Sequence, residues 1–433
     1  MNTASEVDSS RRINSSASTS ASWYRWPLCE MLQRFPQGRL TMELPDGTSR
    51  EFGKGESGPQ AIIAVRNENF FRRCVLFGGV GMGEAYMDGD WDSPDLRAVI
   101  EWFVVNVHHD QLCKGSADRM PLVGFLKMIN RLGHLMRPNS RSLSRKNIAE
   151  HYDLGNDFYR LWLDESMTYS CARFTSVEQT LESAQAAKYE ALCQKLDLRS
   201  TDHVLEIGCG WGGFSLHAAS QHGCRVTAVT ISQAQFDAAT EKIRAAGLED
   251  RVTILLQDYR DLTGQFDKIA SIEMLEAVGD NFLEIWCAQC HRLLKPDGIL
   301  AVQMIIVPDG DHAGLRRGTD FIQKHIFPGS LLLSVGRMNQ AMMRTGDLTM
   351  LRLDDMASCY VRTLGQWHDK FNARLDDVRA LGFSETFLRK WNYYLKYCEA
   401  AFATRSISVV QAAYTRRCNF NLHREDGIST LLS

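Results

Sequence analysis

The feature that most constrains the fold of this chain is a short, mainly aliphatic run that leads directly into a cluster of glycines. Residues 204–207 form the run, and Gly208, Gly210 and Gly213 follow it in the pattern G-x-G-x-x-G. The next residues, 214–219, are typical of a helix. Glycines at such a bend permit a left-handed backbone and let a ligand approach without a Cβ in its way. The pattern predicts a strand, a nucleotide-type binding loop and a helix with free N-terminal N–H groups.

Two details favour S-adenosylmethionine (SAM) over a dinucleotide as the ligand of this loop. Glu206 lies two residues before the first glycine, where a carboxylate can reach a positively charged amino acid moiety. The following strand, 225–229, ends at Thr230 and Ile231, without the acidic residue that an NAD ribose usually requires. A glycine-rich turn without a ligand and an NAD-dependent oxidoreductase are the weaker alternatives.

The composition is that of an ordinary globular protein. Of 433 residues, 44% are hydrophobic and 23% are charged, which is enough for two or three domains. The net charge of -3 gives no reason to expect nucleic acid as a partner. The cysteines lack disulfide-like spacing, no secretory signal opens the chain, and no apolar run approaches the ~18 residues of a membrane span. We therefore expect a cytoplasmic protein that is soluble or at most peripheral to a membrane.

Changes in composition divide the chain into four parts. Residues 1–22 are rich in serine and have little to bury, which predicts a disordered tail. Residues 23–110 are globular but show no catalytic constellation, and we expect a small α+β accessory domain there. Residues 111–147 form a basic segment with a linker at its end. Residues 148–433 alternate strands and helices and should form one α/β catalytic domain.

The catalytic domain is expected to have βαβ spacing. Its first strands are expected at 203–207, 225–229, 251–256, 266–272 and 298–304. A long helical insertion is expected at 309–344. Beyond it, a helical segment at 359–404 lies between the strand candidates 348–353 and 406–410.

The basic segment 111–147 combines positive charge with an amphipathic pattern. Asp118 is its only acidic residue, against Lys114, Arg119, Lys127, Arg131, Arg137, Arg141, Arg145 and Lys146. Apolar residues recur within it at helical spacing. Such a segment can bind an anionic membrane surface by burying its apolar face and attracting lipid headgroups. The alternative is a helix packed on its own domain with solvated arginines.

An ordered set of motifs resembles the cyclopropane-fatty-acyl-phospholipid synthases. The motifs are YDLGND at 152–157, YSC at 169–171, EIGCGWG at 206–212, TIS at 230–232, QDYRD at 257–261, IFPG at 326–329 and YYL at 393–395. Residues 83–89, GEAYMDG, match the accessory domain of the longer, bacterial type of this family. The resemblance implies a Rossmann-like class I SAM-dependent methyltransferase domain, with the small N-terminal α+β accessory domain in front of it.

The resemblance also implies a set of SAM-binding residues at the carboxyl ends of the first three strands, where an open α/β sheet leaves its crevice. They are Tyr169, Ser170, Val204, Leu205, Glu206, Ile207, Gly208, Cys209, Gly210, Trp211, Gly212, Thr230, Ile231, Ser232, Gln233, Ala234, Gln235, Tyr259 and Arg260. No metal is expected.

The implied reaction transfers the SAM methyl group to a cis double bond of a phospholipid acyl chain and then closes a cyclopropane ring. An alkene is a poor nucleophile, so the step has carbocation character and needs an apolar, water-free pocket with aromatic faces. A base must then remove a proton from the new methyl group. In the family this base resembles a bound bicarbonate held by polar side chains. Cys171, Glu276 and Cys398 occupy three of the corresponding positions.

Two candidate catalytic positions depart from the family pattern. Gln303 stands where the family usually has a histidine, and His368 stands where it has a tyrosine. Gln303 can still donate a hydrogen bond to an anion, and His368 can donate or act as a base near neutral pH. Either the anion site is rebuilt, or proton removal is altered and the product is a methylated or methylene-bearing chain.

The leading hypothesis is an enzyme peripheral to the inner face of the cell membrane that acts on unsaturated phospholipids in the bilayer, with a homodimer as one option for its assembly. A small-molecule (amine) methyltransferase and a non-catalytic lipid-binding protein are the alternatives. The basic segment and the accessory domain favour lipid over an amine. The intact glycine loop, together with Cys171, Glu276 and Cys398, argues against a protein that has lost turnover.

We expect Arg131, Arg137, Arg141 and Arg145 to help place the protein on anionic bilayers. Each basic residue near such a surface contributes roughly 1 kcal/mol, and salt screens the attraction. Replacing the four arginines by glutamate should reduce co-sedimentation with anionic vesicles, and added salt should weaken the binding of the wild type. Vesicle binding that responds to neither change would mean that the segment packs internally.

Overall fold

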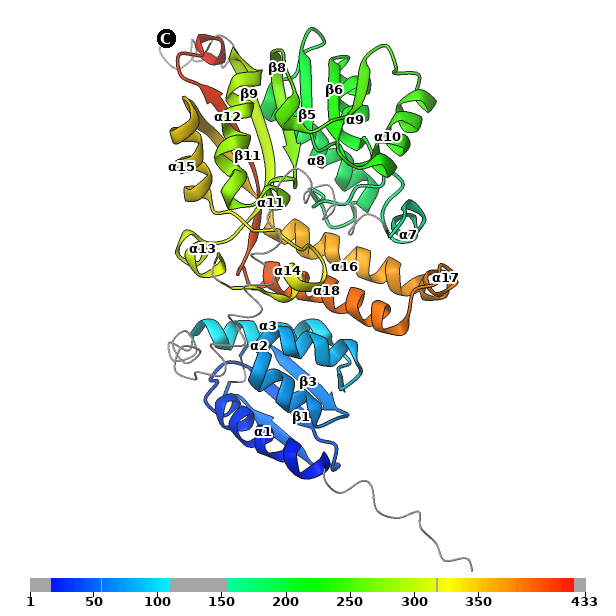
Figure 1. Cartoon of the computed structure of the whole chain (residues 1–433), viewed down its shortest axis with the longest axis vertical. Helices are drawn as coiled ribbons and strands as arrows, with labels where there is room; N and C mark the ends of the chain where they lie inside the picture. The colour runs from blue at the N-terminus through cyan, green and yellow to red at the C-terminus, as the bar shows by residue number, and fades with distance from the viewer. Residues whose placement is uncertain (1–16, 56, 110–153, 317, 424–433) are drawn as a thin grey trace, which may run out of the picture. The chain divides into compact units, whose positions relative to one another are not determined.

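The computed structural model describes residues 17–55, 57–109, 154–316 and 318–423 (Figure 1). Contacts divide the chain into two compact units, which are Met1–Met128 with Glu385–Tyr393, and Ile129–Ser384 with Tyr394–Ser433. The basic segment 111–147, with the membrane binding predicted for it, lies outside the described residues. Within the described residues, no helix is both long and apolar enough to span a bilayer.

The first unit is a small α+β body. Its sheet has the order β2-β1-β3-β4, formed by β1 (Arg39–Glu43), β2 (Ser49–Phe52), β3 (Gln60–Val65) and β4 (Trp91–Asp92). Its helices are α1 (Ala17–Leu32), α2 (Asn69–Met87) and α3 (Leu96–His109). Large aromatic side chains, among them Trp91 and Trp102, fill its core. Because α1 begins at Ala17, the predicted tail 1–22 is too long at its C-terminal end, and residues 1–16 are not described.

The motif at 83–89 lies where α2 ends and the chain turns toward β4. The Tyr86 and Trp91 rings lie 5.1 Å apart. Arg389, in the same unit, lies over the Tyr86 ring at 4.1 Å and donates hydrogen bonds to the Tyr86 and Trp91 carbonyl oxygens and to Asp92. The motif thus packs against Trp91 and Arg389 within this unit.

The second unit contains a seven-stranded sheet of order β10-β11-β9-β8-β5-β6-β7. Its strands are β5 (His203–Ile207), β6 (Arg225–Thr230), β7 (Val252–Leu256), β8 (Phe266–Ile272), β9 (Leu294–Ile306), β10 (Leu348–Asp355) and β11 (Ser408–Arg416). Strands β5 to β9 pair in parallel, while β11 is antiparallel to both β9 and β10. The α/β, Rossmann-like fold predicted from the sequence is confirmed.

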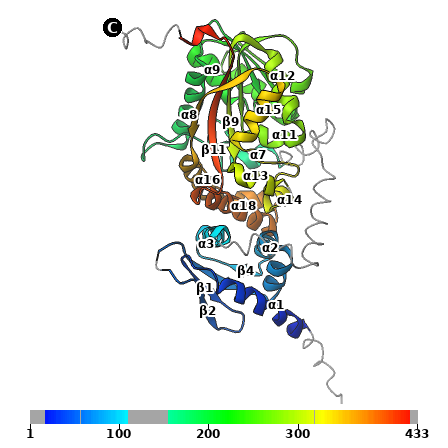
Figure 2. The same cartoon turned by 90° about the vertical axis from the view of Figure 1, so that its left-hand side faces the viewer.

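Helices cover both faces of this sheet (Figure 2). On one face, α12 (Leu283–Leu293) and α15 (Val335–Thr345) pack over side chains that include Leu205 and Ile207. On the other, α8 (Leu181–Leu196) and α9 (Gly213–His222) pack over side chains that include Val204. Because side chains alternate along a strand, Glu206 points with Val204 toward α8 and α9.

The remaining helices correct two expectations. The second unit also contains α7 (Asn156–Arg160), α10 (Gln233–Ala245), α11 (Leu275–Val278), α13 (Asp309–Leu315), α14 (Phe321–His325), α16 (Ala357–Ala373), α17 (Leu375–Ala380) and much of α18 (Glu385–Ala403). The insertion at 309–344 is thus three separate helices. The Pro328-Gly329 pair, in which Gly329 has φ +83°, lies in the break between α14 and α15. The helical segment at 359–404 is likewise divided into three.

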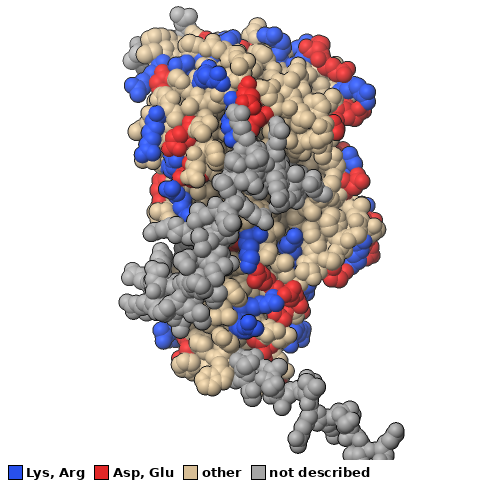
Figure 3. Space-filling model, in the orientation of Figure 1, with Lys and Arg blue, Asp and Glu red and all other residues tan. Residues whose placement is uncertain are grey.

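The charged side chains on the described surface are mixed in sign. Figure 3 shows Lys and Arg interspersed with Asp and Glu on the face that it presents, without a broad single-sign patch among the coloured residues. A continuous basic surface would be needed to track a nucleic acid backbone.

Candidate active site

The glycine loop connects β5 to α9 and is tied to the neighbouring strand. The N–H groups of Gly208 and Cys209 both donate to the Val229 carbonyl oxygen at 3.0 Å. Gly208 has φ +85°, and a Cβ there would lie 2.7 Å from Met274 Cγ. Gly210 has φ +51°, and a Cβ there would meet nothing within 4 Å. Gly208 is therefore required by close packing, whereas Gly210 borders open space.

Glu206 lies beneath this loop as a buried carboxylate. The Ser215 hydroxyl, in the first turn of α9, donates a hydrogen bond to it. Burial raises the pKa of Glu206 to about 8, against the hydrogen bond from Ser215 and the charge of Lys188. The side chain expected to reach a charged amino acid moiety is thus already engaged with the helix that follows the loop.

Residues 230–235, which begin at the end of β6, form the second segment of the predicted cofactor site, after the glycine loop. The Thr230 hydroxyl donates to Gln235 Oε1 at 2.9 Å and accepts from the Ser232 N–H at 3.2 Å. Asn156 of α7 joins this segment to the glycine loop, because it accepts from Trp211 Nε1 at 2.9 Å and donates to the Ala234 carbonyl oxygen at 3.4 Å. Asn156 belongs to the motif at 152–157 but was not among the predicted site residues.

The third segment follows β7, where Tyr259 and Arg260 begin a short 3₁₀ helix (Tyr259–Asp261). The Arg260 guanidinium donates to both carboxylate oxygens of Asp258, at 2.9 and 2.6 Å. These hydrogen bonds raise the pKa of Arg260 further, and they balance its charge within the protein. Gln289 supports the same segment by donating to the Tyr259 carbonyl oxygen at 2.9 Å.

Tyr169 lies in a cluster of aromatic side chains. Its hydroxyl is hydrogen bonded to that of Tyr394 at 2.6 Å. Its ring lies 5.4 Å from each of the Tyr159, Trp162 and Trp367 rings. Tyr159 in turn lies 5.2 Å from Trp211 of the glycine loop. A cluster of packed aromatic rings therefore lies beside the loop.

Lys188 is a buried cation that the sequence reasoning missed. Its Nζ donates to Ser170 Oγ at 2.8 Å, and burial lowers its pKa to about 8, against the opposing charges of Glu273, Asp164 and Glu206. On α8 it lies four residues from each of two buried apolar positions, Ala184 and Leu192. A lysine at that spacing on the buried face of a helix is the signal that could have identified it.

Glu273 organises the predicted catalytic residues and was also missed. Its Oε1 accepts from the Cys171 N–H at 2.9 Å and from Gln303 Nε2 at 2.7 Å, and its Oε2 accepts from the Tyr360 hydroxyl at 2.8 Å. Gln303 in turn accepts from Gln411 Nε2 at 3.0 Å. Burial raises the pKa of Glu273 despite these donors. Its place directly after a buried strand, at the carboxyl edge of the sheet, could have marked it.

Glu276, one turn further on in α11, differs from Glu273 in its hydrogen bonding. Its Oε1 accepts from the Ile305 N–H at 2.5 Å. Its Oε2 is buried and has no hydrogen-bond partner among the described residues. Burial raises the pKa of Glu276 to about 8, and the nearby charge of Glu273 contributes to the increase. A buried carboxyl with one free oxygen can accept or donate a proton inside the site.

The other predicted catalytic residues are placed differently. The Cys171 thiol is buried and donates to the Ala172 carbonyl oxygen at 3.2 Å. Burial raises the pKa of the Cys398 thiol, and the charge of Asp320 adds to the increase, so this thiol stays protonated. His368 contacts Asp369 at 3.4 Å, and burial and Lys396 lower its pKa. No described hydrogen bond joins His368 to Glu273 or Glu276.

Comparison with known proteins shows what the chain is similar to. Residues 139–412 match the family model described as mycolic acid cyclopropane synthetase. The chain is 36% identical to tuberculostearic acid methyltransferase UfaA1 of Mycobacterium tuberculosis over 86% of each chain, and 37% identical to cyclopropane-fatty-acyl-phospholipid synthase of Escherichia coli over 82% of this chain and 88% of the relative. A solved mycolic acid cyclopropane synthase complexed with SAH and CTAB has a TM-score of 0.59 and 28% identity, covering 63% of this chain and 98% of that one.

The glycine loop can be tested with matched glycine substitutions. Because Gly210 has φ +51°, a residue with a larger or branched side chain would be strained there, and Gly210→Ala is the cleanest change. Gly247 is the control, because it also has positive φ (+66°) and open space around its Cβ position. Each alanine should cost roughly 1–2 kcal/mol of stability. Only Gly210→Ala should weaken SAM binding in calorimetry, and equal affinities in the two variants would refute the loop assignment.

Proposed function

The chain belongs to the mycolic acid cyclopropane synthetase family and is a SAM-dependent methyltransferase of lipids, and from this premise we propose that it methylates a cis double bond of a phospholipid acyl chain and then closes a cyclopropane ring. The family resemblance inferred from the motifs is confirmed. The similarity to the Escherichia coli phospholipid enzyme supports the substrate class, since it extends over most of both chains. The buried carboxyl Glu276, with its free Oε2 beside Glu273, is the observation that carries the proposed chemistry.

SAM supplies an electrophilic methyl group on a sulfonium. We assign its binding to the glycine loop, the segment at 230–235 and the segment at Tyr259 and Arg260. The aromatic cluster around Tyr169 excludes water and offers ring faces to the positive charge that develops on the acyl chain. A dry pocket is needed because water would trap that cation.

Glu276 is our candidate for the base. When a C–H bond of the new methyl group breaks, its electron pair closes the ring and its proton passes to Glu276 Oε2. A carboxylate whose pKa is raised toward neutrality is a stronger base than an exposed one. Glu273, held as an anion by its three donors and by the charge of buried Lys188, keeps the pKa of Glu276 high through like-charge repulsion.

Bicarbonate fits this site poorly. The Gln303 amide and the Cys171 N–H, two donors that could hold an anion, already bind the Glu273 carboxylate. A free anion would also meet two buried carboxyl groups. We therefore derive no step through bicarbonate and propose that the Glu273–Glu276 pair replaces it.

A second product is the specific alternative. Gln303 is held between Glu273 and Gln411, and the described hydrogen bond of the His368 ring is to Asp369, so we assign proton removal to neither substituted position. If deprotonation is slow, a hydride can shift on the cation first, and proton loss then leaves a methylene-bearing chain. The similarity to a tuberculostearic acid methyltransferase favours this alternative. An amine substrate lacks comparable support.

The basic segment bears on where the enzyme acts. We propose that the basic segment 111–147 places the protein at the inner face of the cell membrane, where its phospholipid substrate lies.

The pH dependence tests the carboxyl pair. Glu276 gains its base form as pH rises through its pKa of about 8, so turnover on unsaturated phospholipid vesicles should increase from neutral to alkaline pH. Glu276→Gln should reduce turnover by about 10²- to 10⁴-fold and remove this pH dependence. Glu273→Gln should move the midpoint to lower pH by roughly one unit, because a like charge is lost.

Glu284→Gln is the control for these variants, since Glu284 is partly exposed and paired with Arg337. SAM binding should remain in all three variants. Activity should also persist in buffer depleted of bicarbonate. A Glu276→Gln variant with wild-type turnover and pH profile would exclude Glu276 as the base.

Product analysis separates ring closure from methylation. Cyclopropane and methylene products both add one CH₂, so proton NMR of the lipid is needed beside mass spectrometry. We expect mainly cyclopropane from the wild type on one defined cis-unsaturated phospholipid. Gln303→His with His368→Tyr, which restores the family residues, should give equal or greater cyclopropane output. A wild type that makes almost none, beside a double variant that does, would favour the methylase.

A further inference from the structure

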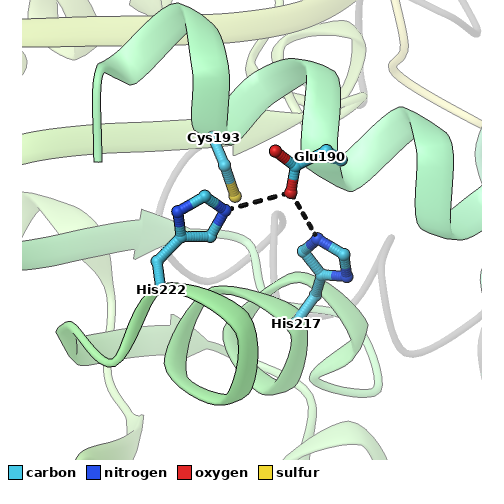
Figure 4. A group of neighbouring side chains, drawn as sticks. All are labelled: Glu190, Cys193, His217 and His222. Atoms are coloured by element: carbon cyan, nitrogen blue, oxygen red, sulfur yellow. Dashed lines mark hydrogen bonds and ion pairs between the residues drawn. The ribbon is translucent and has the colours of Figure 1, made fainter. Parts of the chain in front are cut away.

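A second cluster of chemically reactive side chains lies between α8 and α9. Glu190 and Cys193 come from α8, and His217 and His222 come from α9 (Figure 4). One ligand atom from each side chain lies within 4.8 Å of the other three. None of these four residues belongs to the proposed cofactor or substrate site.

The packing of the two helices brings the four side chains together. Glu190 and Cys193 are three residues apart, so they share one face of α8. Apolar side chains such as Leu192 and Phe214 pack the two helices over the same face of the sheet. Figure 4 shows all four side chains pointing into the space between the helices.

The distances resemble those of a tetrahedral metal site. Both histidine Nε2 atoms approach the same Glu190 oxygen, at 3.2 Å from His217 and 3.0 Å from His222. With metal–ligand distances of about 2.0–2.2 Å, neighbouring nitrogen and oxygen ligands of a tetrahedral zinc are roughly 3.3–3.5 Å apart. Gln194 donates to the other Glu190 oxygen at 3.1 Å and so orients the carboxylate, as residues behind metal ligands commonly do.

We propose that Glu190, Cys193, His217 and His222 bind a zinc ion. The mixed nitrogen, sulfur and oxygen donors suit zinc, and a carboxylate with a thiolate balances its two positive charges. Cys193 is buried, while the side chains of Glu190, His217 and His222 are 37%, 16% and 21% exposed, which leaves a path from solvent. Four protein ligands complete the coordination, so the ion is structural and takes no part in methyl transfer.

The ion would hold together the two helices that support the glycine loop. Helix α9 begins at Gly213, directly after the loop, and Gly213 lies against the Tyr189 hydroxyl of α8. Tyr189 in turn is hydrogen bonded to Thr168 at 2.7 Å, next to the predicted cofactor residue Tyr169. Zinc between α8 and α9 would therefore reduce local opening beneath the SAM site.

Metal titration of the full-length protein tests the proposal. After treatment with a chelator, the wild type should take up one equivalent of zinc. It should also bind cobalt with the visible spectrum of a tetrahedral site and a thiolate-to-cobalt charge-transfer band. Cys193→Ala should lose the charge-transfer band, and His222→Gln should weaken uptake. Cys224→Ala is the control, because Cys224 is equally buried in the same core but is not a ligand.

Two results would overturn the proposal. One is a folded wild type that binds neither zinc nor cobalt, which would leave a hydrogen-bonded His–Glu–His cluster without a metal. The other is a charge-transfer band that survives in Cys193→Ala and disappears in Cys224→Ala. Zinc should also raise the melting temperature of the wild type, and it should raise that of His222→Gln less. This readout does not depend on the methyltransferase reaction.

Discussion

A charge buried beneath the glycine loop is the constraint on which the catalytic unit depends. Lys188 is fully buried on α8, donates to Ser170, and faces the charges of Glu206 and Glu273. Removing a lone ammonium from water would cost several kcal/mol. The carboxylates of Glu206 and Glu273 offset that cost only if they lie close to Lys188. Helix α8, strand β5 and the end of β8 must therefore pack against one another in a fixed arrangement. The same requirement orders the loop and the residues that we assign to proton removal.

The two carboxyl groups after β8 share this environment but carry different hydrogen bonds. Glu273 receives three donors, whereas Glu276 receives one and keeps a free oxygen. Burial raises the pKa of both carboxyl groups, and two like charges in a dry site cannot both form freely. The three donors to Glu273 oppose the increase there, whereas the charge of Glu273 adds to the increase at Glu276. The division of roles that we propose for the two carboxyl groups rests on this difference in burial and donors.

Many elements of the catalytic unit could be predicted because local patterns specify them. Strands β5 and β8 were located from their aliphatic runs, and the glycines specify a bend whatever surrounds it. The helices between β9 and β10 were less well predicted, because a single helical insertion at 309–344 was expected to continue across the Pro328-Gly329 pair. The substituted positions Gln303 and His368 were visible in the sequence, but their surroundings were not. Gln303 proves to be held within the sheet by Glu273 and Gln411.

The sequence by itself determined the family, the Rossmann-like fold class and the position of the glycine loop, since motifs and periodicity are properties of neighbours along the chain. Only the tertiary structure decided which distant side chains share a buried space. Lys188, Glu273 and Tyr360 lie on three separate elements, and their roles depend on desolvation and on donors contributed by other strands and helices. The cluster of Glu190, Cys193, His217 and His222 arises for the same reason, because helix packing joins residues that no local pattern connects.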